Sequence, residues 1–199
     1  SFREEYKLPF FLNADHHKSV EAAKKAVDAG YDSVHIDLSV EPYEKNVAGT
    51  KEIVEYVRYK NPNINVEGEL GYLRGDSKIQ KEKIIIKPED LTNPDTAKGF
   101  VEKTGVNRLA ISVGNIHGIS MDEPALDIRL IKAIREAIPK EAALVLHGGS
   151  GIPADQIKRA VKAGISNVHI NTELRVAYAE TLRRELSRNP EEVVPYKFD

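Results

Sequence analysis

Short apolar runs rich in β-branched residues alternate along the chain with longer stretches in which apolar residues recur every three or four positions. The first pattern is typical of buried strands and the second of amphipathic helices. Together they predict strands at 9–14, 33–38, 64–70, 108–113, 142–146 and 167–170, and helices at 19–29, 47–60, 94–104, 126–137, 153–163 and 173–188. Strands that alternate with helices indicate an α/β fold with a parallel sheet.

Polar residues distinguish a closed barrel from an open sheet, because a barrel carries its functional groups at the carboxyl ends of several strands. No Gly-x-Gly-x-x-Gly motif follows the first predicted strand, which argues against a dinucleotide-binding sheet. We therefore expect a (β/α)8 TIM barrel with about six β/α units visible. The polar clusters at the strand ends are Asp15-His16-His17, Asp37-Leu38-Ser39, Glu67-Gly68-Glu69, Asn115-Ile116-His117-Gly118, His147-Gly148-Gly149-Ser150-Gly151 and His169-Ile170-Asn171-Thr172.

The length of the chain falls short of a full barrel, which takes eight strands and about 250 residues. We expect residues 1–199 to form a single barrel domain shortened at both ends, with the first two β/α units missing. The outermost strands would then be unpaired, so we expect either further N-terminal residues in the natural protein or an oligomer, a homodimer or homotetramer, that covers the gap. Residues 71–93 hold one strand-like run, Ile84-Ile85-Ile86, in a long polar segment that is typical of a functional lid.

Composition narrows the classes of function. With 29 Lys and Arg against 31 Asp and Glu, the net charge of −2 provides no field that attracts nucleic acid or an anionic membrane. The chain contains no cysteine, so a bound metal must use histidine and carboxylate ligands. The longest apolar runs are strand-sized and no signal peptide is evident, so we expect a cytoplasmic enzyme with a small-molecule substrate.

Three histidines, His16, His117 and His147, stand at the ends of three different predicted strands. A catalytic zinc ion typically has three protein ligands and one open position, and neutral imidazole suits it. One such histidine is more often a structural hydrogen-bonding residue, but three at equivalent positions favour a metal site. We interpret His35, in mid-strand, as structural, and His17 as pointing elsewhere because it follows His16.

Carboxylates stand at two further strand ends. Asp37 and Glu69 either form a second cation site or orient the imidazoles. Glu67 lies two residues before Glu69 and therefore on the same strand face. An alternative for all three is a salt-bridge network inside the barrel.

The segment from Gly148 to Gly151 leads from a strand into a helix that begins near Pro153. Glycines let the backbone approach a ligand, and amides near a helix N-terminus attract phosphate. Barrels often bind phosphate after their last two strands, where Asn171 and Thr172 would also lie. The alternative is a tight turn with no ligand.

The motifs resemble, in order and spacing, those of the class II, zinc-dependent fructose-bisphosphate aldolases. The likeness extends over nearly the whole chain. The stretches that carry it are Asn13-Ala14-Asp15-His16, Ile36-Asp37-Leu38-Ser39, Glu67-Gly68-Glu69-Leu70-Gly71, Gly114-Asn115-Ile116-His117-Gly118, His147-Gly148-Gly149-Ser150-Gly151 and Asn171-Thr172-Glu173-Leu174.

The resemblance implies a lyase that reversibly cleaves fructose 1,6-bisphosphate to dihydroxyacetone phosphate and glyceraldehyde 3-phosphate through a zinc-stabilised enediolate. It implies that His16, His117 and His147 hold catalytic Zn²⁺ and that Asp15 is the acid/base for the aldehyde half. A second divalent or monovalent cation would use Asp37 and Glu69. The residues implied to hold the ketone substrate and its phosphate are Gly118, Gly148, Gly149, Ser150, Asn171 and Thr172.

Two departures from the family pattern concern the substrate and the base. His169 stands where the family usually has asparagine, and the acidic lid motif that supplies the carbon base is not recognisable after Gly71, where Asp76 and Glu82 are the nearest carboxylates. A tagatose-bisphosphate or other ketose-bisphosphate aldolase therefore remains an alternative. A non-catalytic barrel fragment or scaffold is a second alternative.

Overall fold

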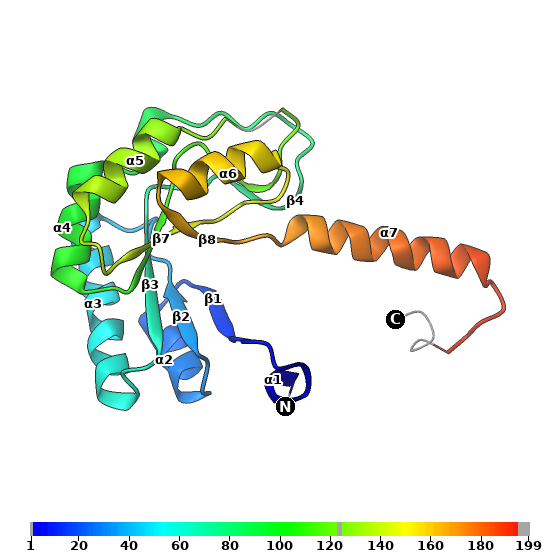
Figure 1. Ribbon diagram of the computed structural model, residues 1–199, viewed down its shortest axis with the longest axis horizontal. Coiled ribbons are helices and arrows are strands. Elements are labelled where there is room, and N and C mark those ends of the chain that lie inside the picture. Colours follow the sequence, from blue (N-terminus) through cyan, green and yellow to red (C-terminus); the bar gives the residue numbers. More distant parts are fainter. Residues whose placement is uncertain (1, 123–124, 195–199) are drawn as a thin grey trace.

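The computed structural model describes residues 2–122 and 125–194, and its centre is a parallel sheet of six strands. Neighbouring strands follow one another along the chain, as in a barrel, in the order β1-β2-β3-β5-β7-β8 (Figure 1). Within the described residues, β1 and β8 each pair on one side only, so the sheet is an open part of a barrel. The strands are β1 (Asn13–His17), β2 (Ser33–Ile36), β3 (Asn65–Leu70), β5 (Arg108–Ile111), β7 (Ala143–Leu146) and β8 (Ile165–Val168).

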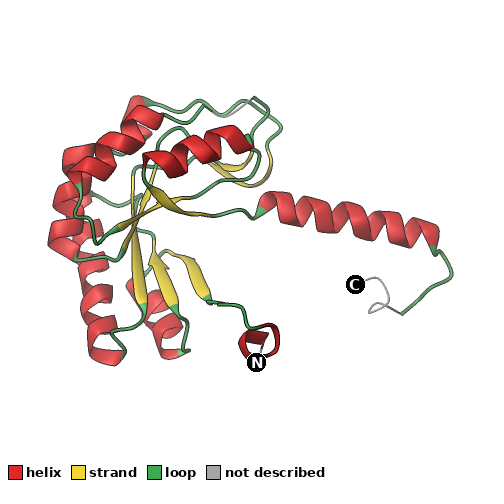
Figure 2. Ribbon diagram, in the orientation of Figure 1, coloured by secondary structure: helices red, strands yellow, loops and turns green. Residues whose placement is uncertain are grey.

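Helices connect successive strands and cover one face of the sheet (Figure 2). The fully buried Ile53, Phe100, Leu109, Ile131 and Leu144 belong to the hydrophobic core that the sheet and helices form. These helices, each in contact with the next, are α2 (Val20–Asp28), α3 (Tyr43–Lys60), α4 (Pro94–Thr104), α5 (Ile128–Ala137) and α6 (Ala154–Ala163).

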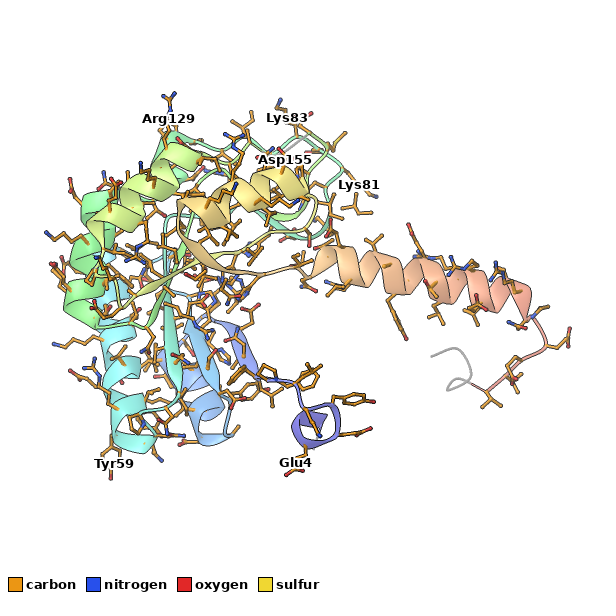
Figure 3. All side chains as sticks on the ribbon, viewed as in Figure 1. Glu4, Tyr59, Lys81, Lys83, Arg129 and Asp155 are labelled. Carbon is orange, nitrogen blue, oxygen red and sulfur yellow. The ribbon has the colours of Figure 1, made fainter. Side chains whose placement is uncertain are left out.

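The last helix, α7 (Thr172–Arg188), extends away from the body of the molecule (Figure 1). Its side chains project along most of its length into solvent (Figure 3), and of its described residues only Thr172 is buried. Leu174 and Tyr178 are 66% and 61% exposed. A short helix, α1 (Phe2–Tyr6), lies at the other end of the chain. No helix among the described residues is both long enough and apolar enough to cross a bilayer.

A second, two-stranded parallel sheet joins β4 (Gly75–Ile79) to β6 (His117–Ile119). The sequence did not predict it, because every residue of β4 is exposed and its Gly-Asp-Ser-Lys-Ile sequence has no apolar alternation. The strand-like character expected for Ile84-Ile85-Ile86 is wrong: this run has no regular structure, and Ile85 is 70% exposed. A 3-10 helix, η1 (Pro88–Asp90), follows it.

All six predicted strands and six predicted helices are present, which confirms the α/β assignment. The first strand is displaced, however, from the expected 9–14 to Asn13–His17. Phe11 and Leu12 are 72% and 63% exposed, so the apolar run before Asn13 is not a buried strand. Asp15 and His16, expected just after the strand, lie within it instead. The sixth strand is also displaced, from 167–170 to Ile165–Val168.

Candidate metal centre and active site

A bulge in β1 brings two consecutive polar side chains to one cavity. Pairing with β2 advances three residues on β1, from Ala14 to His17, while it advances two on β2, from Val34 to Ile36. His16 accordingly has a φ of 50°, which is uncommon for a non-glycine residue. A regular strand would point Asp15 and His16 to opposite faces, whereas here both line the same cavity.

This cavity, of about 40 Å³, lies where the strands of the sheet end, and it collects most of the predicted site residues. A larger cavity of about 660 Å³ shares Asp15, His169 and Asn171 with it, so the small cavity adjoins space for a larger ligand. The small cavity is lined by Asp15, His16, Ser77, His117, Gly118, His147, Gly148, Ser150, His169, Asn171 and Thr172.

The three predicted zinc ligands approach one another in this cavity. The ring centroids of His16 and His117 are 4.9 Å apart, those of His16 and His147 are 4.6 Å apart, and those of His117 and His147 are 6.4 Å apart. The Nε2 atoms of His16 and His117 lie only 3.3 Å from each other. Two imidazole lone pairs at this separation repel unless a proton or a cation lies between them.

The protonation of these imidazoles suits metal binding. Burial lowers the pKa of His117 and, despite the hydrogen bond that His147 donates to Glu67, also that of His147, so both rings are neutral at pH 7. Neutral imidazole is the form that binds zinc, and a set of imidazoles and carboxylates without thiolates is a common catalytic zinc environment. The residues present therefore fit a zinc ion.

Asp37 orients the ring of His16 through a hydrogen bond at Nδ1. Nδ1 of His16 lies 2.8 Å from Oδ2 of Asp37, and the Ser39 hydroxyl donates to Oδ1 at 2.7 Å. Lys18 also donates to Asp37. Burial raises the pKa of Asp37, but these hydrogen bonds outweigh it and hold the pKa well below its usual range. An ionised Asp37 accepts the Nδ1 hydrogen of His16 and leaves Nε2 free.

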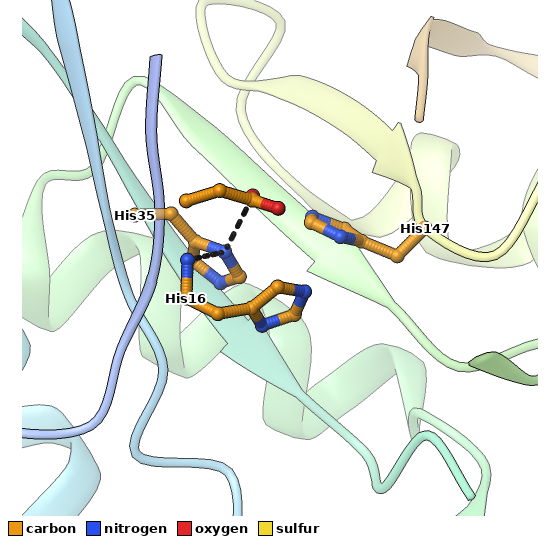
Figure 4. A group of neighbouring side chains, drawn as sticks. His16, His35 and His147 are labelled. Atoms are coloured by element: carbon orange, nitrogen blue, oxygen red, sulfur yellow. Dashed lines mark hydrogen bonds and ion pairs between the residues drawn. The ribbon is translucent and has the colours of Figure 1, made fainter. Parts of the chain in front are cut away.

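His35 lies at the centre of three carboxylates rather than in the ordinary core. It is fully buried, with Nε2 3.2 Å from Oε2 of Glu69 and Nδ1 3.6 Å from Oδ1 of Asp15 and 3.7 Å from Oε1 of Glu67. Burial lowers its pKa, but contacts with Asp15 and Glu69 raise it to about 10. Figure 4 shows His35 beside His16, with His147 approaching both. Donor atoms of His16, His35, Asp37 and Glu69 all lie within 4.8 Å of one another.

Asp15 stands between two imidazoles. Its Oδ1 lies 3.5 Å from Nδ1 of His169, and the other neighbour is His35. Burial raises the pKa of Asp15, but the contacts with His169 and His35 lower it well below the usual range, so the carboxyl group is ionised. Nε2 of His169 lies 3.3 Å from the side-chain nitrogen of Asn167, which is placed to donate to it.

The glycine-rich loop after β7 is bound to the start of α7. Oγ of Ser150 accepts from the backbone N–H groups of Asn171, at 3.2 Å, and Glu173, at 3.3 Å. The Glu173 carboxylate in turn accepts from the backbone N–H of Gly151 at 2.9 Å. Gly149 lies against β8, where its N–H donates to the carbonyl of His169 at 2.8 Å, and it does not line the small cavity.

Comparison with known proteins identifies the family. The family model described as fructose-bisphosphate aldolase class-II matches residues 1–198. The chain belongs to this family. The family membership confirms the resemblance seen in the six motifs, and it agrees with the cluster of histidines and carboxylates that could hold a metal ion.

Individual relatives agree with this assignment. A fructose-bisphosphate aldolase from Staphylococcus aureus (strain Mu50) is 37% identical over 191 residues, which are 96% of this chain and 64% of the relative. The chain thus spans slightly less than two thirds of that curated relative. The YdjI aldolase of Escherichia coli K12 is 31% identical with a TM-score of 0.78, covering 99% of this chain and 65% of that one. A fructose-bisphosphate aldolase from Campylobacter jejuni, 23% identical over 94% of this chain and 58% of its own, supports the fold with a TM-score of 0.70.

Compared with the aldolase motifs, the structure adds three residues to the site. His35 could have been found from strand periodicity, because it lies two positions before Asp37 and therefore on the same face. His169 stood in a predicted polar cluster. Ser77 of β4 had no signal in the sequence, because its place in the cavity depends on the unpredicted pairing of β4 with β6.

Proposed function

We propose that this chain is the core of a metal-dependent aldolase that reversibly cleaves fructose 1,6-bisphosphate to dihydroxyacetone phosphate and glyceraldehyde 3-phosphate. The observation that carries the proposal is the single cavity in which three imidazoles, the Asp15 carboxylate and a glycine-serine loop meet. Aldolase relatives at 37% and 31% identity support it.

In this proposal His16, His117 and His147 hold Zn²⁺. Asp37 and Glu69 either bind a second cation or orient the imidazoles that hold the zinc. Bound zinc would supply a Lewis acid that polarises the ketone oxygen of the substrate and stabilises the negative charge that develops there. The facing Nε2 atoms of His16 and His117, together with the buried Oε2 of Glu69 at 3.8 Å from Nδ1 of His16, support a cation at this place.

Asp15 is the proposed base for cleavage. Because its carboxyl group is ionised, it can accept the proton of the substrate hydroxyl group as the carbon–carbon bond breaks, and it returns that proton during synthesis. The proposed contacts of the ketone and its phosphate are spread over β6, the loop after β7 and the start of α7, and backbone amides near a helix N-terminus attract anions. They are Gly118, Gly148, Gly149, Ser150, Asn171 and Thr172.

The test couples metal analysis to an activity assay. We expect the purified protein to retain zinc, to lose cleavage of fructose 1,6-bisphosphate when treated with a chelator, and to regain it with added zinc. His16→Ala, His117→Ala and His147→Ala should each lose zinc, whereas His17→Ala, next in the chain but outside the cavity lining, should keep it. Normal zinc content in all three variants would refute the proposed centre.

The same assay separates the alternatives. Cleavage of tagatose 1,6-bisphosphate in preference to the fructose substrate would indicate the other ketose-bisphosphate specificity, and His169 in the cavity wall is the residue we would then examine first. Zinc binding without cleavage of any ketose bisphosphate would support the non-catalytic scaffold.

We also propose that the protein assembles as a homodimer or homotetramer. The outer edges of β1 and β8, and exposed apolar side chains on α7 such as Leu174, Tyr178 and Leu186, support assembly. Light scattering should give a multiple of the 22.2 kDa chain mass, and a monomer at all concentrations would contradict this.

A further inference from the structure

Glu67 and His147 form a close contact inside the open barrel. Oε1 of Glu67 lies 2.7 Å from Nε2 of His147, and the two side chains are 0% and 2% exposed. Glu67 lies in β3 and His147 directly follows β7, and these two strands lie on either side of β5. Ala110 of β5, paired with Glu69 on one side and Val145 on the other, is small enough to leave room for a contact across that strand.

This contact determines which nitrogen of His147 carries the hydrogen. A neutral imidazole has one N–H group and one lone pair, and an ionised carboxylate only accepts. Oε1 of Glu67 and Nε2 of His147 are 2.7 Å apart, which is a hydrogen-bond distance, so one of the two atoms must donate to the other. Nε2 of His147 therefore donates to Glu67, and the lone pair lies on Nδ1, on the side of the ring away from Glu67.

The pair of Asp37 and His16 is built in the same way but through the other nitrogen. There the carboxylate takes the Nδ1 hydrogen, which leaves the lone pair on Nε2, 3.3 Å from Nε2 of His117. Two of the three imidazoles are thus each fixed by a buried carboxylate. When a carboxylate that holds a metal-binding imidazole in this way is removed by mutation, the protein commonly binds its metal roughly 10–100-fold more weakly.

We infer that Glu67 is a positioning residue: it holds His147 as the Nε2–H tautomer and so presents Nδ1 to the metal. The inference rests on the proposed zinc centre. A purely structural role, in which Glu67 only balances charge with His35 at 3.7 Å, would leave zinc affinity unchanged. The two roles therefore differ in a measurement that does not involve catalysis.

The first experiment measures zinc affinity of the metal-free protein by competition with a chromogenic chelator. Glu67→Leu should bind zinc about 10–100-fold more weakly. Glu67→Gln, whose amide oxygen still accepts from Nε2, should recover most of the affinity. The control is Asp155→Asn, which neutralises an exposed carboxylate in the first turn of α6, outside the metal cluster, and should bind as tightly as wild type. Wild-type affinity in Glu67→Leu would overturn the inference.

The second experiment needs no variant at the glutamate and remains decisive if Glu67→Leu does not fold. Long-range ¹H–¹⁵N NMR of the metal-free wild-type protein reports the tautomer of each histidine, and a His147→Gln spectrum assigns the signals. We expect Nε2–H at His147, and an Nδ1–H tautomer would overturn the inference. Failure of the proposed function would be seen separately, as a wild-type protein that binds no zinc.

Discussion

Gly148 is the residue of the loop after β7 that tolerates a side chain least. Its φ is 65°, and a Cβ atom placed on it would lie 1.9 Å from the carbonyl oxygen of Ile116. Ile116 directly precedes His117, and Gly148 directly follows His147. The close approach of the backbone at Gly148 to the backbone at Ile116 therefore places His147 and His117 at the same cavity. Only glycine combines this backbone conformation with this contact.

We expect Gly148→Ala to lower the free energy of unfolding by at least about 3 kcal/mol, because both the backbone and the segment at Ile116 must shift. Gly30→Ala is the control: Gly30 has a φ of 85° but no atom within 4 Å of the added carbon, so it measures the backbone cost alone, about 1–2 kcal/mol. Urea unfolding of the two variants gives the comparison. Equal losses would contradict the steric explanation.

At the scale of elements, an ion pair ties down the segment that carries β4. Arg74 donates to both carboxylate oxygens of Asp90, with Nε 2.5 Å from Oδ2 and Nη2 2.9 Å from Oδ1, and the backbone N–H of Lys87 donates to Oδ2 at 2.7 Å. The hydrogen bond from Arg74 lowers the pKa of the buried Asp90 below its usual value. The ion pair between Arg74 and Asp90 joins the two ends of residues 74–90, a segment that would otherwise be a long loop.

The lowered pKa of Asp90 has a definite consequence for stability. A group whose folded pKa is lowered adds stability that is fully present above its unfolded pKa, about 3.9, and is lost as pH falls through the folded pKa. Asp90→Asn should therefore unfold at lower urea than wild type at pH 7, with a difference that shrinks below about pH 4. The exposed Asp155→Asn is the control. A difference that is independent of pH would show that the ion pair contributes nothing.

The sequence predicted the elements well where capping residues and periodicity mark them. The α4 bounds are those predicted, because Asn93 caps its first turn and Gly105, in a left-handed conformation, ends it. β1 was displaced because its bulge and the φ of His16 have no local sequence signal. Polarity at strand ends was enough to place His117 in the site, but the role of Glu67 follows from a contact across β5, which only the folded sheet brings about.

On the scale of the whole molecule, the two faces of the sheet have opposite character. The face under the helices is apolar, with fully buried Leu109 and Leu144, whereas the opposite face carries buried His35, Glu67 and His147. Buried charges destabilise a fold unless they are paired or bind a ligand. In this open barrel the buried polar groups are paired, His147 with Glu67 at 2.7 Å and His35 with Glu69 at 3.2 Å.

His16 and His117, whose nitrogens face each other in the cavity, are 101 residues apart in sequence. An unfolded chain cannot hold them together, so zinc at the proposed centre would bind essentially only the folded state, and folding and binding would become one equilibrium. At a free zinc concentration of 100 times the dissociation constant, the gain in unfolding free energy is about 2.7 kcal/mol. A thermal-shift titration should show a rising midpoint in wild type and His17→Ala but not in His117→Ala, so that heat alone, with no sugar phosphate present, reports whether the centre has assembled.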